Sequence, residues 1–187
     1  ALGRVQRSQR HLLGMINDLL NLSEVDAGRV QYDIVHIPVG PVLQSVAKLL
    51  TPHARANGMS ITVAPLVDGD EALAVQADAE KLEQILVNLI GNAIKFTDRG
   101  RVDVGCEPRA DHVRLRVRDT GIGIPSDKLG VIFEPFVQVR AGLTRTAEGV
   151  GLGLAISRDL ARGMGGDLEV ESTVGVGTTL TLTLPRP

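Results

Sequence analysis

The sequence predicts an α+β fold, a two-layer sandwich in which helices cover one face of a mixed, mostly antiparallel sheet. Three observations support this prediction. Apolar residues recur every three to four positions in several segments, as in amphipathic helices, and alternate with polar residues in others, as in half-buried strands. Two pairs of predicted strands are joined by short turns, as in hairpins. Such a domain buries one stripe of each helix against one face of the sheet.

The composition is that of a globular domain. The chain has 187 residues, 43% of them hydrophobic, and a net charge of −2, which suits one domain of ordinary size plus an appendage. The near balance of charge gives no reason to expect nucleic acid or an anionic membrane as a partner. With no Trp, one Tyr and three Phe, recognition of nucleic acid by base stacking is also disfavoured.

Cysteine content and hydropathy exclude further classes. Cys106 is the one cysteine, so no disulfide or cysteine-based metal site can form within one chain. It falls on the apolar face of a predicted strand, and we expect a buried structural thiol. No apolar run approaches the ~20 residues of a membrane-spanning helix, and no signal peptide is visible. Because the chain begins within a helical pattern and without an initiator Met, we expect a fragment of a longer protein.

Residues 2–26 are predicted to form one long helix ahead of the sandwich. Its stripe recurs at spacings of seven, four, three and four, through Val5, Leu12, Ile16, Leu19 and Ser23. This pattern is typical of a coiled coil or a helix bundle. The helix therefore needs a partner helix, supplied by another chain or by a preceding segment.

The remaining elements follow in order. We predict an extended linker over 30–41 with a short strand at 32–37, a helix over 41–58, strands at 61–63 and 73–75, and a helix over 79–96 capped by Asp78. We then predict a hairpin of strands at 102–106 and 112–118, a short helix over 126–131, a helix over 151–162, and strands at 167–171 and 178–184. Residues 133–150 have no clear period, and a loop of that length in a compact domain indicates a functional lid.

The strand at 112–118 ends in the first candidate site. Its side chains alternate between polar and aliphatic, so Asp119 falls on the apolar side. A buried carboxylate needs hydrogen-bond donors, and the glycine-rich turn that follows exposes backbone N–H groups, which indicates a ligand site. The alternative is a helix N-cap. Thr178 shares the inward side of the last strand, where an acid and a hydroxyl could read the amino group and ring nitrogen of adenine; the alternative is a local backbone hydrogen bond.

The helix over 79–96 carries a second candidate site. Asn88, Asn92 and Lys95 lie at i, i+4 and i+7, on a face next to the apolar stripe. Two amides and an amine in line suit phosphate oxygens and a hard cation such as Mg²⁺, which takes oxygen ligands and keeps several waters. The alternative is an ordinary solvated helix face.

Glycines open the helix predicted at 151–162. The Walker pattern is absent, and the dinucleotide fingerprint is incomplete because a third glycine and a preceding strand are missing. The run from Gly149 to Gly153 nevertheless precedes a helix, and free N–H groups at a helix N-terminus attract anions. The preceding loop, with Arg140 and Arg145, could close over a polyphosphate.

Taken together, these motifs resemble the catalytic, ATP-binding domain of bacterial sensor histidine kinases, in the superfamily shared with gyrase, Hsp90 and MutL. Five segments match in order and spacing: residues 88–97 resemble the asparagine box, 119–125 the first glycine box, 133–136 the phenylalanine box, 149–154 the second glycine box and 175–185 the closing box. Residues 2–28 resemble the second helix of the dimerisation and phosphotransfer domain. The resemblance thus implies a Bergerat-type fold and three parts: residues 1–28 from that helix, a linker at 29–40 and a catalytic domain at 41–187.

The resemblance also implies roles. Asp119 would accept from the adenine amino group with Thr178 nearby, Asn92 would bind Mg²⁺ with support from Asn88, and Lys95 would contact phosphate. The other positions implied at the nucleotide are Phe96, Gly121, Gly123, Ile124, Gly149, Gly151, Leu152, Gly153 and, on the γ-phosphate, Arg145. Glu148 and Val150 depart from the family pattern, which commonly has Gly and Thr there, so the family's threonine hydroxyl near phosphate is absent at this position.

One position separates branches of this superfamily. Members that hydrolyse ATP have a Glu where this chain has Asn88, and a neutral amide cannot act as a general base toward water. The sequence therefore favours phosphoryl transfer to a histidine over hydrolysis. The family's phosphoacceptor motif is absent, and His11 has no following acid, so we expect no autophosphorylation by this fragment alone. The alternatives are a conformational ATPase of the gyrase or Hsp90 type and a non-enzymatic nucleotide-binding module.

The partners implied by the resemblance are a phosphoacceptor histidine domain, the receiver domain of a response regulator and, through the N-terminal helix, a second copy of the chain. The implied setting is a phosphorelay on the cytoplasmic side of a bacterial membrane, with a parent protein that is either soluble or anchored in the inner membrane. ATP and Mg²⁺ are the implied cofactors.

Overall fold

The computed structural model describes residues 14, 16, 19, 20, 23, 28–65, 73–138 and 150–187. Most of the predicted N-terminal helix, including His11, lies outside the described residues. The same holds for residues 139–149 of the predicted lid, and so for Arg140, Arg145, Glu148 and Gly149.

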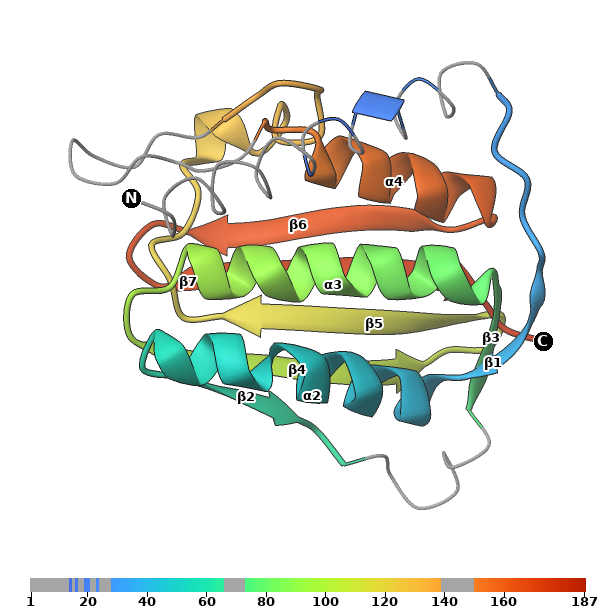
Figure 1. The fold of residues 1–187 in the computed structure, drawn as a ribbon, viewed down its shortest axis with the longest axis horizontal. Helices are drawn as coiled ribbons and strands as arrows, with labels where there is room; N and C mark the ends of the chain where they lie inside the picture. Colours follow the sequence, from blue (N-terminus) through green and yellow to red (C-terminus); the bar gives the residue numbers. More distant parts are fainter. Residues whose placement is uncertain are drawn as a thin grey trace, which may run out of the picture.

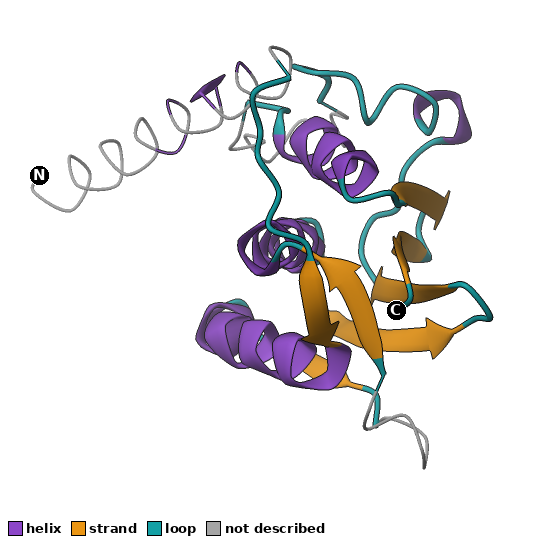
Figure 2. Cartoon of the chain, turned by 90° about the vertical axis from the view of Figure 1, so that its right-hand side faces the viewer, coloured by secondary structure: helices purple, strands orange, loops and turns teal. Residues whose placement is uncertain are grey.

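Two sheets and three helices form the described part of the chain. The larger sheet has the order β2-β4-β5-β7-β6, with β2 parallel to β4 and all other neighbours antiparallel. Its strands are β2 (Met59–Val63), β4 (Gly100–Pro108), β5 (His112–Asp119), β6 (Asp167–Thr173) and β7 (Gly177–Pro185). The helices are α2 (Val39–Ala56), α3 (Ala79–Lys95) and α4 (Gly153–Gly163). All three lie side by side on one face of this sheet (Figures 1 and 2), which confirms the predicted fold class.

The central strand β5 shows why the chain folds this way. Val113, Leu115 and Val117 are at most 2% exposed, whereas the intervening residues are not buried. Because successive side chains point to opposite faces, this alternation places one face of the sheet under the helices. Beneath them the core is formed mainly by Leu, Ile and Val.

Cys106 is half-buried, which corrects the prediction of a buried thiol. Strand β2 pairs with β4 only as far as Val63 opposite Val104. Cys106 therefore lies beyond the last residue pair that β2 forms with β4, and it packs only at the margin of the core.

The helix α3 occupies the centre of the helical layer (Figure 1). Its buried face consists of Leu82, Ile85, Leu86, Leu89, Ile90, Ala93 and Ile94. Asp78 caps its N-terminus as predicted, with one carboxylate oxygen accepting from the N–H groups of Glu80 and Lys81 over 3.0 Å each. With this face buried, the polar stripe of Asn88, Asn92 and Lys95 lies at its edge.

Some predicted boundaries were wrong. The helix expected from Gly151 begins at Gly153, because Gly151 has φ 79°, a left-handed conformation that a right-handed helix cannot contain. The segment expected to be helical at 126–131 forms only the 3₁₀ turn η2 (Ser126–Lys128). The linker strand is β1 (Val35–Pro38), and it pairs antiparallel with β3 (Ala74–Ala77) in a separate two-stranded sheet, a pairing that the sequence did not predict.

Within the described ranges, no helix has the length and apolar character needed to cross a membrane.

Candidate functional site

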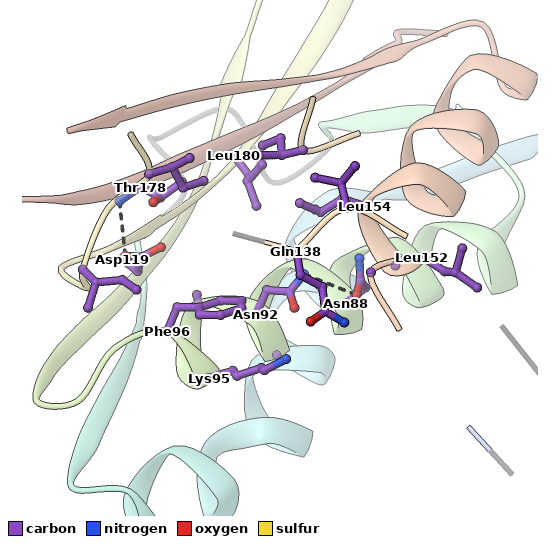
Figure 3. Close-up of a pocket in the computed structure, with 18 of the residues that line it drawn as sticks. Asn88, Asn92, Lys95, Phe96, Asp119, Gln138, Leu152, Leu154, Thr178 and Leu180 are labelled. Atoms are coloured by element: carbon purple, nitrogen blue, oxygen red, sulfur yellow. Dashed lines mark hydrogen bonds between the residues drawn. The ribbon is translucent and has the colours of Figure 1, made fainter. Parts of the chain in front are cut away.

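A cavity of about 390 Å³ lies between α3, the loop after β5, the segment before α4 and the start of β7. It brings together residues that are far apart in the sequence (Figure 3). The predicted site residues that line it are Asn88, Asn92, Lys95, Phe96, Asp119, Gly123, Ile124, Gly151, Leu152, Gly153 and Thr178. Gly121 does not line it, and Arg145 and Gly149 lie outside the described residues.

Asp119 is 7% exposed and lies at one end of the cavity (Figure 3). Its Oδ1 accepts from the Gly121 N–H over 2.8 Å and from the Thr178 N–H over 3.2 Å. Burial raises the pKa of Asp119 above the ordinary value of 3.8, and these two hydrogen bonds oppose the rise. Oδ2 has no hydrogen-bond partner among the described residues. Asp119 therefore offers one acceptor to a ligand and does not cap a helix.

Gly121 has a packing role beside Asp119. A Cβ atom on Gly121 would lie 2.3 Å from the Phe96 carbonyl oxygen and 2.9 Å from Asp119 Oδ1. Only a glycine fits there, because real Cβ contacts are never that short. Gly121 thus lets the backbone of Phe96 approach this turn, and its contact with a nucleotide stays a prediction.

Thr178 meets Asp119 through its backbone and not through its hydroxyl. The hydroxyl lies 2.9 Å from Ser172 Oγ across the β6–β7 pair. Ser172 Oγ also accepts from the Ile124 N–H over 2.8 Å and donates to the Gly177 carbonyl over 2.9 Å. Ser172 was missed by the sequence reasoning; the signal available was that it precedes the turn leading to Thr178.

Amide side chains of α3 form the other end of the cavity. Asn92 Nδ2 donates to Asn88 Oδ1 over 3.4 Å, and Asn88 Nδ2 donates to Ser157 Oγ over 2.9 Å. Ser157, on α4, is 3% exposed and was also missed by the sequence reasoning. Because Ser157 lies one turn after Gly153, their spacing on a helix could have revealed it. Gln138, which lines the cavity near these amides (Figure 3), is a third residue that was missed.

Glycines at the start of α4 allow close packing at the cavity wall. A Cβ atom on Gly153 would lie 2.4 Å from Asn88 Oδ1. A Cβ atom on Gly151 would lie 2.6 Å from the Val137 carbonyl oxygen, and the Gly151 carbonyl accepts from the Phe136 N–H over 3.0 Å. Gly153 thus lets α4 approach the Asn88 amide of α3, and Gly151 lets the chain approach the backbone of Phe136 and Val137.

Charge is distributed unevenly around the cavity. Asp119 and Lys95 are the charged residues among the described lining residues. Lys95 Nζ lies 4.9 Å from the centroid of the Phe96 ring. A ligand that carries both an amino group, for Asp119, and negative charge, for Lys95, matches these two charges.

The donor set fits a hard cation only if the ligand supplies most of the oxygens. The described residues contain no group of three or more His, Cys, Asp or Glu side chains that could hold a metal. The amide oxygens of Asn88 and Asn92 are of the kind that Mg²⁺ accepts, and Mg²⁺ is commonly held by one or two protein oxygens together with substrate phosphates. The cavity thus fits a metal–nucleotide complex better than a resident ion.

Comparisons with known proteins agree with this geometry. The family model described as histidine kinase-, DNA gyrase B- and HSP90-like ATPase matches residues 77–187. The chain is 39% identical over 182 residues, 97% of its length, to an uncharacterised sensor-like histidine kinase of Rhizobium meliloti. It is 37% identical over 191 residues, 100% of its length, to the sensor protein GacS of Pseudomonas syringae. It covers 34% and 21% of these two relatives.

Among solved structures, full-length ShkA in complex with AMPPNP superposes with a TM-score of 0.84 at 34% identity, covering 98% of this chain and 38% of that one. The chain therefore belongs to the family of histidine kinase-, DNA gyrase B- and HSP90-like ATPases. Within that family, it is an ATP-binding catalytic domain of the sensor histidine kinase type.

Proposed function

We propose that this domain binds Mg·ATP in the cavity and transfers the γ-phosphoryl group to a histidine of a phosphoacceptor domain. The observation that carries the proposal is the polarity of the cavity, with a buried acceptor at Asp119 and amide and ammonium groups on α3. The phosphorus–oxygen bond to the β-phosphate breaks, a phosphorus–nitrogen bond to the imidazole forms, and ADP leaves. Such transfer depends mostly on positioning and charge neutralisation.

Each residue has a role in this proposal. Asp119 accepts from the adenine amino group, and Phe96 packs near the base. Lys95 contacts phosphate, and the amide oxygen of Asn92, supported by Asn88, would hold Mg²⁺, which would neutralise charge on the phosphates. For Arg145 and Gly149, the proposed contacts to the phosphates rest on the family resemblance alone.

Transfer is favoured over hydrolysis by the groups around Asn88. Its amide nitrogen and oxygen are engaged by Ser157 and Asn92, and a neutral amide takes no proton from water. The one acid among the described lining residues is Asp119, at the end of the cavity where we propose that the base binds (the base end). The described wall therefore contains no general base for water beside the phosphates.

The proposal also covers the longer protein to which this chain belongs. The chain spans about a fifth to a third of the relatives named above. We therefore place the acceptor histidine and the response regulator in segments or partners beyond it, and the dimer contact in its N-terminal helix. We assign residues 1–28 to the dimerisation and phosphotransfer domain, 29–40 to a linker and 41–187 to the catalytic domain, on the cytoplasmic side of a bacterial membrane. Ile16 and Leu19, in the first of these parts, are 46% and 55% exposed, which leaves them available to a partner helix.

The test is phosphotransfer from γ-labelled ATP to an added histidine phosphoacceptor domain, with phosphate release measured in parallel. The proposal expects label on the acceptor, little free phosphate when the acceptor is absent, and loss of labelling in Asp119→Asn and Asn92→Asp. Rapid phosphate release without acceptor would instead support the conformational ATPase. Nucleotide binding with neither activity would support the non-enzymatic module.

A further inference from the structure

The Ser172 hydroxyl lies behind the base end of the cavity and has three close partners. Its Oγ is 2.8 Å from the Ile124 nitrogen, 2.9 Å from the Gly177 carbonyl oxygen and 2.9 Å from Thr178 Oγ1. Ser172 does not line the cavity, whereas Thr178 and Ile124 do. It is therefore a group that acts on the cavity through its neighbours.

The three contacts determine the direction of each hydrogen bond. A serine hydroxyl has one proton and two lone pairs. The Ile124 N–H can only donate, and the Gly177 carbonyl can only accept, so the serine proton goes to Gly177 and one lone pair is used by Ile124. The remaining lone pair must accept the proton of Thr178. Toward a ligand, the Thr178 hydroxyl can then offer only lone pairs.

Hydrogen-bond donors and acceptors can be counted in the same way for Asp119, which lies beside Thr178. Oδ1 already accepts two backbone N–H bonds, from Gly121 and Thr178, and an ionised carboxylate has no proton to give. Both polar side chains at this end, Asp119 and Thr178, are thus acceptors. A ligand edge with two N–H hydrogens is complementary to them, whereas a carbonyl would leave acceptor facing acceptor in a desolvated site.

We propose that Ser172 sets the hydrogen-bonding polarity of the base end by holding the Thr178 hydroxyl as an acceptor. The base end then selects a purine that carries an exocyclic amino group, through both of its N–H hydrogens. This inference rests on the proposed function, in which the base lies at Asp119. Ser172 is a positioning residue and contacts no ligand.

The first test uses Thr178→Val, which removes the hydroxyl but keeps the backbone N–H that bonds Asp119. Dissociation constants are measured by calorimetry for ADP, for IDP and for the diphosphate of purine riboside, which keeps the ring nitrogens but lacks the amino group. Loss of one neutral hydrogen bond should raise the dissociation constant of ADP about five- to tenfold. The dissociation constant of purine riboside diphosphate should not change. If purine riboside diphosphate weakens as much as ADP, Thr178 donates to a ring nitrogen and the inference is wrong. Thr179→Val, on the opposite face of β7, is the matched control.

The second test uses Ser172→Ala, which frees the Thr178 proton to donate to a ligand carbonyl. The ratio of the IDP to the ADP dissociation constant should fall about tenfold, and Ser172→Thr, which keeps a hydroxyl, should restore the wild-type ratio. A purely structural role would weaken both nucleotides together and leave the ratio unchanged, which would overturn the inference. If Ser172→Ala does not fold, the inference is tested by the binding of ADP and purine riboside diphosphate to Thr178→Val.

A wild-type domain that binds none of these nucleotides would refute the proposed function itself. A wild-type domain that binds ADP, with an unchanged ratio in Ser172→Ala, would refute only the role of Ser172.

Discussion

Replacing Asp119 by Asn changes a single atom of the candidate site from acceptor to donor. Two backbone N–H groups hold Oδ1 in wild type, so the amide oxygen of the variant must stay at that position and accept the same bonds. The amide NH₂ then occupies the position of Oδ2 and, in the proposed complex, faces the adenine amino group. The fold is preserved while the ligand contact is reversed.

The magnitude follows from the two effects on binding. A hydrogen bond to a charged acceptor contributes about 1.5–3 kcal/mol, and leaving a buried donor unpaired costs about 1–3 kcal/mol. Even a combined loss of about 3 kcal/mol corresponds to a roughly 150-fold weaker dissociation constant for ATP. Calorimetry with ATP and ADP measures this change in the dissociation constant. The control is Asp127→Asn, which also removes one negative charge, but from the exposed turn η2.

Stability should move in the opposite direction. The pKa of Asp119 is raised by burial despite the two hydrogen bonds, so the ionised carboxylate destabilises the folded state at neutral pH. The variant should therefore unfold at an equal or higher urea concentration at pH 7. Its advantage should vanish as the pH falls through the raised pKa towards 3.8, and wild-type affinity for ATP should decrease over the same range. An affinity within threefold of wild type at pH 7, in a folded variant, would refute the reasoning.

Three further changes probe the other end of the cavity and the surface. Gly153→Ala should lower the affinity for ATP at least about tenfold, with little change in the thermal midpoint of unfolding. The reason is that the added Cβ would displace the Asn88 amide, whose Oδ1 would be 2.4 Å away. Unchanged affinity would contradict this packing. Ser157→Ala should lower the free energy of unfolding by about 1 kcal/mol and reduce the Mg²⁺-dependent part of the affinity for ATP, since Asn88 loses its 2.9 Å hydrogen-bond partner. Calorimetry with and without Mg²⁺ measures the change in affinity. An equal loss of affinity in both conditions would argue against this role of Ser157. Burial opposes ionisation of Asp167, but hydrogen bonds from Arg158 and others lower its pKa to about 2. Asp167→Asn should therefore destabilise the fold at pH 7, by an amount that shrinks in urea titrations as the pH falls from 3.8 to about 2.

Much of the fold was predictable because it depends on local periodicity. The alternation in β5 and the stripe on α3 each specify one buried face, and the Asp78 cap marks a helix start. The start of α4 was predicted wrongly, because the sequence pattern did not show that Gly151 has a left-handed φ and lies against the backbone of Val137. The pairing of β1 with β3 was not predicted, because it joins segments that are separated by α2.

By itself, the sequence determined the fold class, the inward position of Asp119 and the line of Asn88, Asn92 and Lys95, since all of these follow from spacing along one element. Only the tertiary structure decided which atoms meet. It placed the backbone of Thr178, and not its hydroxyl, on Asp119, and it brought two unpredicted serines behind the cavity. The physical reason is that a hydrogen bond depends on distances and directions between elements, which the pattern of residues along a single element does not specify.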